Sequence, residues 1–176
     1  NDEGWGRITL TNIIFTNIST TPRYYEYVDQ TTLLTDGQVY VRHTLVQNSD
    51  QPLKITLAYT DVAGFPGAIP ALVNDLDLEA VAPDGTLYRG NQFAGNVSAP
   101  NAPSPDTLNN VEVVHLAQPL AGDYLVRVRA RHVVQDARLD TFTIDQDFAL
   151  VVSGNIARPS SGSVLLDRSS YTAPGV

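Results

Sequence analysis

The chain of 176 residues is acidic, with a formal net charge of -8, and contains neither cysteine nor methionine. Such an excess of carboxylates repels phosphate backbones, so no nucleic-acid partner is expected. The lack of cysteine excludes a disulfide scaffold and thiolate metal sites. No apolar run reaches the length of about 18 residues that a membrane span needs, so no membrane partner is expected either. The length suits one domain with a proper core and shorter flanking segments.

Alternation of apolar and polar residues with a period of two is the dominant pattern along the chain. It begins in "QVYVRHTLV" (38–46) and "LKITLAYT" (53–60), which it predicts to be half-buried strands. "VEVVHLA" (111–117) and "DFALVVSG" (147–154) are more apolar and predict strands nearer the centre, and "DYLVRVRAR" (123–131) shows the clearest alternation. Turn signals separate these runs and no helical period occurs, so the prediction is an all-β fold, an antiparallel β-sandwich or jelly-roll barrel. The inward residues should include Ile55, Leu57, Val126, Val128, Phe148 and Leu150.

Two long segments between the expected strands are predicted to be loops. "TDVAGFPGAIPA" (60–71) is rich in glycine and proline, and "FAGNVSAPNAPSPDTLNN" (93–110) is polar. Loops longer than about 12–15 residues are usually functional or disordered. "ARPSSGS" (157–163) has the composition of a linker.

The sequence shows no arrangement typical of a catalytic centre. There is no G-x-S-x-G motif for a nucleophile, and no glycine-rich phosphate loop. Of the three histidines, His43 and His115 lie inside expected strands among apolar neighbours, where a structural role is favoured over a catalytic one. With three histidines and no cysteine, a zinc site is not expected. We therefore predict no catalytic residue in this chain.

The sequence does contain candidate oxygen ligands for a hard cation. In "ALVNDLDLEAVAPDG" (71–85), Asn74, Asp75 and Asp77 stand where a strand begins, although Asn and Asp are depleted in strands. Asp61 ends the strand before, and "DTLNNVE" (106–112) supplies further oxygens. Ca²⁺ prefers such carboxylate, amide and carbonyl ligands. The alternative is that these acids flank turns in solvent or accept hydrogen bonds from backbone N–H groups.

Arg127, Arg129 and Arg131 form a positive stripe on one face of the expected strand 123–131. One interpretation is a solvated face of a sheet. The other is a docking surface for an acidic neighbour.

Three segments, in order, carry a resemblance to a known group of proteins. They are "ALVNDLDLEAVAPDGTLYRGNQF" (71–93), "NNVEVVHLAQPLAGDYLVRVRA" (109–130) and "FALVVSG" (148–154). Together they resemble the C-terminal β-domain of secreted subtilisin-like serine proteases, a jelly roll similar in placement to the P-domain of kexin and furin. "GWGRITLTNIIF" (4–15) is similar to the end of the catalytic domain in those proteases, and "SGSVLLDRSSYTAPG" (161–175) to the start of a further β-module.

The resemblance implies three parts: the end of a catalytic domain with its connector (1–21), the β-domain (22–156), and a linker with the start of a truncated module (157–176). It implies a non-catalytic accessory domain that stabilises the catalytic domain of a secreted subtilisin-like serine protease, because the catalytic triad would lie upstream of Asn1. The catalytic domain of the same chain is then the expected partner, and the protein is expected to be a monomer. It also points to Ca²⁺ at Asp61, Asn74, Asp75 and Asp77. Residues 1–15, with Trp5, are expected to pack poorly without that catalytic domain.

Two other functions remain open. Jelly rolls often serve as lectins, so the chain is alternatively a β-sandwich module that binds carbohydrate or a cell surface. The single tryptophan, Trp5, lies outside the expected β-region, which disfavours stacking on sugars. An adhesion or spacer module in a surface array is the third interpretation, and it rests on the truncated module expected after Ser160. Fold analogy alone does not choose among these functions.

Overall fold

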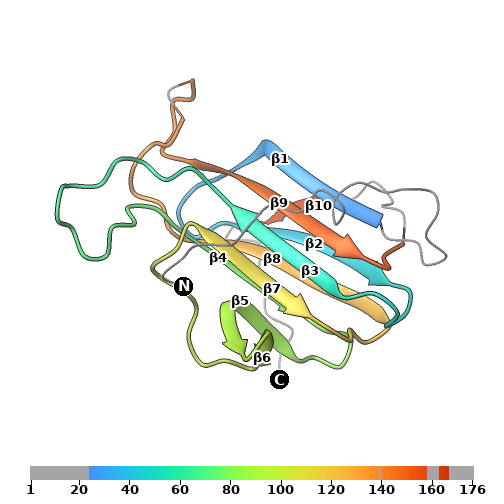
Figure 1. The fold of residues 1–176 in the computed structure, drawn as a ribbon. Coiled ribbons are helices and arrows are strands. Elements are labelled where there is room, and N and C mark those ends of the chain that lie inside the picture. Colours follow the sequence, from blue (N-terminus) through green and yellow to red (C-terminus); the bar gives the residue numbers. More distant parts are fainter. Residues whose placement is uncertain (1–23, 139, 158–162, 167–176) are drawn as a thin grey trace.

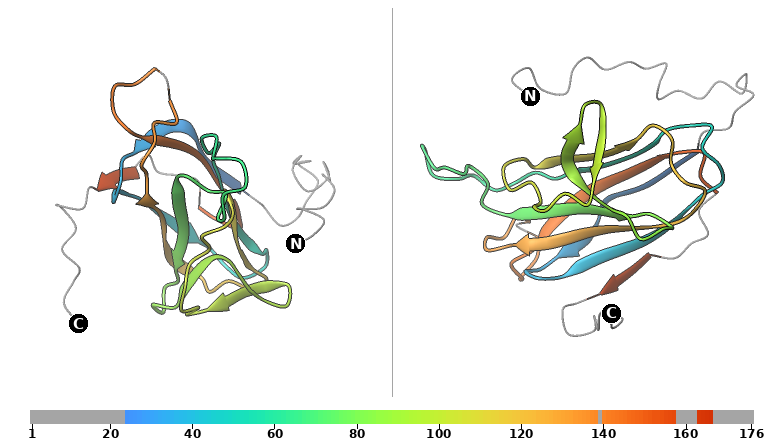
Figure 2. Two further views of the ribbon diagram at one scale, coloured as in Figure 1. Left: turned by 90° about the vertical axis from the view of Figure 1, so that its left-hand side faces the viewer. Right: turned by 90° about the horizontal axis from the view of Figure 1, so that it is seen from below.

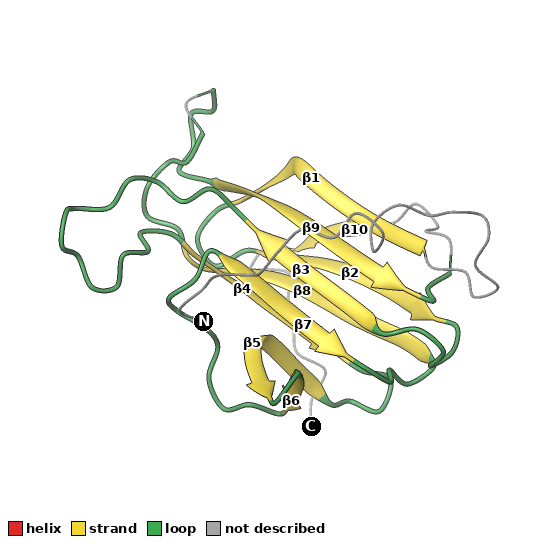
Figure 3. Cartoon of the chain, viewed as in Figure 1, coloured by secondary structure: helices red, strands yellow, loops and turns green. Residues whose placement is uncertain are grey.

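The computed structural model describes residues 24–138, 140–157 and 163–166. Trp5, the segment 1–21 and most of 157–176 lie outside the described residues, so the expectations for them remain predictions. Within the described ranges the chain forms strands and loops but no helix (Figure 3). These ranges therefore contain no helix that is long and apolar enough to cross a membrane.

Ten strands occur in the described part of the chain (Figure 1). They are β1 (Tyr24–Leu34), β2 (Val39–Val46), β3 (Leu53–Ala58), β4 (Asp75–Val81), β5 (Leu87–Ala94), β6 (Val97–Pro100), β7 (Val111–Leu116), β8 (Gly122–His132), β9 (Gln146–Gly154) and β10 (Ser163–Leu166). One sheet has the order β1-β9-β3-β7 and the other β10-β2-β8-β4-β5-β6, and the neighbours in both are antiparallel.

Apart from β4, β5 and β6, which are neighbours in one sheet, consecutive strands alternate between the two sheets, and the resulting order is that of a jelly roll. The two sheets pack face to face as a sandwich and are not closed into a barrel (Figure 2). The predicted all-β sandwich is therefore confirmed. The prediction that 93–110 is one uninterrupted loop is wrong, since β5 extends to Ala94 and β6 occupies Val97–Pro100.

The core between the sheets follows the alternation in the sequence. In β8, Tyr124, Val126, Val128 and Ala130 are buried, and the residues between them face outward. The six residues that the sequence predicts to face inward, Ile55, Leu57, Val126, Val128, Phe148 and Leu150, are all buried. Tyr40 of β2 meets Phe148 of β9 across the core, edge to face, with ring centroids 5.4 Å apart.

The hairpin β5–β6 diverges from β4 within the six-stranded sheet and covers β7, the edge strand of the four-stranded sheet. β4 and β5 pair only over Glu79–Val81 on β4. Beyond that point Asn91, at φ 57°, turns its amide onto β7: its Oδ1 accepts from Val113 N at 2.9 Å and its Nδ2 donates to Val111 O at 2.8 Å. Side chains thus replace a neighbouring strand at the β7 edge.

Four connections gather at one end of the sandwich, which we call the loop end. They are the β1–β2 turn (35–38), the β3–β4 loop (59–74), the β6–β7 loop (101–110) and the β8–β9 loop (133–145). The β3–β4 and β8–β9 loops project from the body on the left of Figure 1. All four residues of the predicted calcium site lie in, or just next to, the β3–β4 loop.

Candidate functional site

Asp61 clasps the two ends of the β3–β4 loop. Its Oδ1 accepts from Val62 N and Asn74 N, both at 2.9 Å, and its Oδ2 accepts from Val73 N at 2.8 Å. A carboxylate that receives three backbone N–H groups closes a loop in the way that Asx turns do over a shorter span. This is the structural alternative that the sequence left open for the acids near the strand ends.

Asn74 joins the β3–β4 loop to the β8–β9 loop. Its side chain is fully buried. The Nδ2 group donates to Gln135 O at 2.8 Å and to Gln146 Oε1 at 3.0 Å, and Oδ1 accepts from Val134 N at 3.0 Å and Gln135 N at 3.2 Å. Two donors and two acceptor positions are all that an amide offers, so Asn74 is fully engaged by protein groups.

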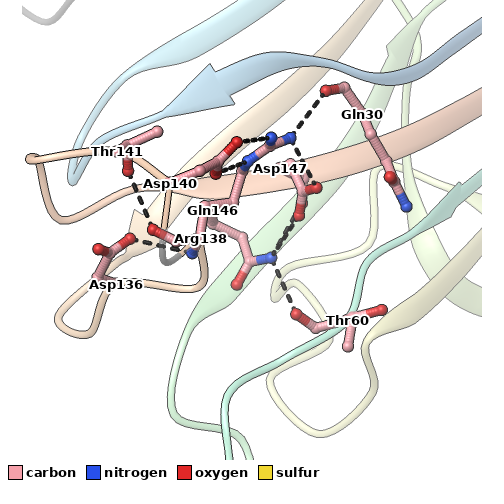
Figure 4. A network of polar contacts seen from close by, with 8 residues as sticks. All are labelled: Gln30, Thr60, Asp136, Arg138, Asp140, Thr141, Gln146 and Asp147. Carbon is pink, nitrogen blue, oxygen red and sulfur yellow. Dashed lines mark hydrogen bonds and ion pairs between the residues drawn. The ribbon is translucent and has the colours of Figure 1, made fainter.

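Gln146 extends this network to Thr60 in the β3–β4 loop, and Arg138 extends it to Gln30 in β1 (Figure 4). Gln146 is fully buried, and its Nε2 donates to Thr60 O at 3.0 Å. The Arg138 guanidinium donates two hydrogen bonds to the carboxylate of Asp140, at 2.8 and 2.6 Å, and a longer one to Gln30 O, at 3.4 Å. Sequence reasoning missed both residues. The one signal for Gln146 is a polar residue at the start of an otherwise apolar strand.

Asp75 and Asp77 lie farther along, in β4, in a different environment. Asp77 is 1% exposed, and its Oδ2 is 3.3 Å from the guanidinium of Arg131. The Oδ1 atoms of Asp75 and Asp77 are buried and have no hydrogen-bond partner. Burial, followed by the charge of Asp75, raises the pKa of Asp77 to about 6. Burial also raises the pKa of Asp75, although Arg131 opposes that shift.

The arginine stripe of β8 is largely matched by acids of β4. Glu79, which is almost buried, lies 2.6 Å from Arg89, 2.9 Å from Arg127 and 3.8 Å from Arg129. A hollow beside these pairs is lined by Asp36, Val39, Arg127, Arg129 and Arg131, among others. The stripe is thus paired within the domain, although in these pairs four arginines share the two carboxylates of Glu79 and Asp77.

Glu112 points inward from the beginning of β7 and is fully buried. Its Oε2 accepts from Leu78 N at 2.7 Å, at the part of β4 that β5 has left unpaired, and its Oε1 has no partner. A Cβ at position 90 would overlap the Glu112 side chain, which explains why Gly90 stands there. Burial, with smaller contributions from Asp77, Asp106 and Asp75, raises the pKa of Glu112 to about 9.

The structure therefore divides the four predicted calcium ligands. Asp61 and Asn74 organise the loops, whereas Asp75 and Asp77 keep unpartnered oxygens. Across the residues that the structure describes, no group of three or more histidine, aspartate or glutamate side chains has an arrangement that could hold a metal ion. Of the four predicted calcium ligands, Asp75 and Asp77 are therefore the two whose carboxylates still have an unpartnered oxygen for a cation.

Glu112 gives a prediction about pH. Since its pKa is raised in the folded state, Glu112 stabilises the fold fully below its unfolded pKa of about 4.3, and this contribution declines as the pH rises toward about 9. Glu112→Gln cannot titrate. The free energy of unfolding of the variant, minus that of the wild type, should grow by roughly 1 kcal/mol per pH unit between pH 5 and 8.

Urea unfolding at several pH values in the presence of a chelator measures this difference. Asp50→Asn, at an exposed turn residue, is the control. A difference for Glu112→Gln that stays constant with pH would show that Glu112 is ionised in the folded protein throughout this range.

Comparison with known proteins gives one informative match. No family model matches the chain. The chain is 31% identical, over 177 aligned positions, to the "Serine protease/ABC transporter B family protein tagA" of Dictyostelium discoideum. The alignment covers 95% of this chain and 9% of that protein. The match gives a coarse link between this all-β domain and a region of a protein that is named for a serine protease.

Proposed function

We propose that this chain is a non-catalytic accessory domain of a secreted subtilisin-like serine protease, and that it stabilises the catalytic domain by packing against it. The observation that carries the proposal is the similarity along 95% of the chain to a protein named for a serine protease. The jelly-roll strand order agrees with the β-domain that the sequence motifs resemble. We propose secretion and the subtilisin-like class of the protease on the basis of that resemblance.

The test uses the natural full-length protein. Deletion of residues 24–156 should shorten the half-life of its peptidase activity on heating, because the catalytic domain loses the packing partner that stabilises it. An interface worth about 1.4 kcal/mol corresponds to roughly a tenfold change. The chain 1–176 alone should have no peptidase activity. An unchanged half-life, or a full-length protein without a serine-protease domain, would contradict the proposal.

We further propose that Asp75 and Asp77 bind Ca²⁺. The supporting observation is that the Oδ1 atom of each residue is buried and has no hydrogen-bond partner. Backbone carbonyls and water would complete the six to eight oxygens that Ca²⁺ takes. The oxygens of Asp61 and Asn74 already accept backbone hydrogen bonds, so we assign those two residues to the loop framework.

Calcium should raise the thermal midpoint of the chain 1–176, because a ligand that binds only the folded state adds about 2.7 kcal/mol at 100 times its dissociation constant. The response should weaken below pH 6, where Asp77 becomes protonated. Asp75→Asn should abolish it, while Asp50→Asn should leave it intact. The same midpoint in millimolar Ca²⁺ and in excess chelator would refute the site.

A further inference from the structure

The β3–β4 loop has a composition unlike that of an ordinary surface loop. From Val62 to Val73, "VAGFPGAIPALV", it contains no polar or charged side chain. Loops lie on the surface and are normally rich in polar residues. Yet the loop projects from the body (Figure 1). Phe65 is 89% and Ile69 96% exposed. Two large apolar side chains that are exposed to solvent on a projecting loop indicate a surface that a binding partner covers.

The loop is also built to hold a shape. Asp61 clasps its base. At its tip, Ala68 N donates to Phe65 O at 3.0 Å around Pro66 and Gly67, and Gly67 has φ +81°, as a type II turn requires. Phe65 and Ile69 therefore stand on either side of a defined turn. A preorganised loop loses less conformational entropy when its apolar side chains are buried in a partner.

Neighbouring loops add apolar side chains at the same end. Eleven large hydrophobic residues are exposed in the described part of the chain, and six of them lie in loops of the loop end. These six are Phe65, Ile69, Leu108, Val134, Phe142 and Ile144. The left-hand view of Figure 2 looks onto this end. The loop end therefore carries more of the exposed large hydrophobic residues than the rest of the described surface.

We propose that the loop end docks onto the catalytic domain of the same polypeptide, with Phe65 and Ile69 inserted into an apolar cleft of that domain. This inference rests on the proposed function and names the surface that performs it. In the β3–β4 and β8–β9 loops three aspartates, Asp61, Asp136 and Asp140, are at least partly exposed, against the single cation Arg138. The complementary cleft should therefore have basic residues at its rim.

The chain length restricts this arrangement. Tyr24, where the described structure begins, lies at the end of β1 opposite the loop end, roughly 35 Å away for a strand of 11 residues. Residues 16–23, which follow the segment similar to the end of the catalytic domain, could span at most about 29 Å, so a docked catalytic domain would extend along the sandwich toward Tyr24. Because the two domains share one chain, their effective concentration is high, and a modest interface suffices.

The experiment compares two double variants of the natural full-length protein. Phe65→Ser with Ile69→Ser removes both anchors. Tyr27→Ser with Leu45→Ser removes two exposed hydrophobic residues from strands outside the loop end, and serves as the control. The readout is the half-life of peptidase activity on heating. The loop variant should lose activity at least fivefold faster than the wild type, and the control should stay within twofold.

The chain 1–176 with the loop substitutions should keep its own thermal midpoint, since both side chains are exposed. That result separates lost docking from misfolding. If deletion of residues 24–156 shortens the half-life but the loop variant does not, the docking face is wrong and the proposed function stands. If the deletion has no effect, the proposed function fails and this inference fails with it.

Two other occupants are distinguished in the same set of measurements. Wild-type chain 1–176 is mixed with phosphatidylcholine vesicles, and its mass is followed over a range of concentrations. Vesicle binding, or dimer formation, that the loop substitutions abolish while the full-length half-life is unchanged would overturn the inference in favour of a bilayer or a second copy. The inference expects neither.

Discussion

The buried side chain of Asn74 is the contact on which the arrangement of the loop end depends. Its four hydrogen bonds join the start of β4 to the β8–β9 loop and, through Gln146, to Thr60 in the β3–β4 loop. A buried amide is costly unless every donor and acceptor is paired, and here every one is. With Asn74 fixed, Asp61 can close the base of the β3–β4 loop and present its apolar tip away from the body.

β4 shows how a strand with acids in it becomes stable. Leu76, Leu78 and Ala80 face the core, while Asp77 and Glu79 alternate with them on the other side. Those two acids meet the arginines that β8 presents on the same face. Breaking one partner of such a buried pair would leave an uncompensated charge, which is far more destabilising than removing an exposed ion pair. The pattern of the β4 sequence therefore complements the pattern of β8.

Much of the fold follows from the sequence, because a period of two is a local property of each strand. Residues such as Leu57 and Val126 are placed inward by their neighbours in the chain alone. The hairpin β5–β6 escaped prediction because Asn91 bonds to β7 residues at least 20 positions away, and no local pattern records such a partner. Glu112 was expected among possible oxygen ligands, yet its inward orientation depends on the unpaired N–H of Leu78 in the other sheet.

The role of Asn74 is tested most directly by Asn74→Asp, which keeps the size of the side chain and replaces its two donated hydrogen bonds by acceptors facing Gln135 O and Gln146 Oε1. Asn96→Asp, at an exposed position, is the matched control. Urea unfolding should show a loss of about 2–4 kcal/mol for Asn74→Asp and less than about 0.5 kcal/mol for the control. Equal, small losses for both variants would contradict the central place of Asn74 in the loop end.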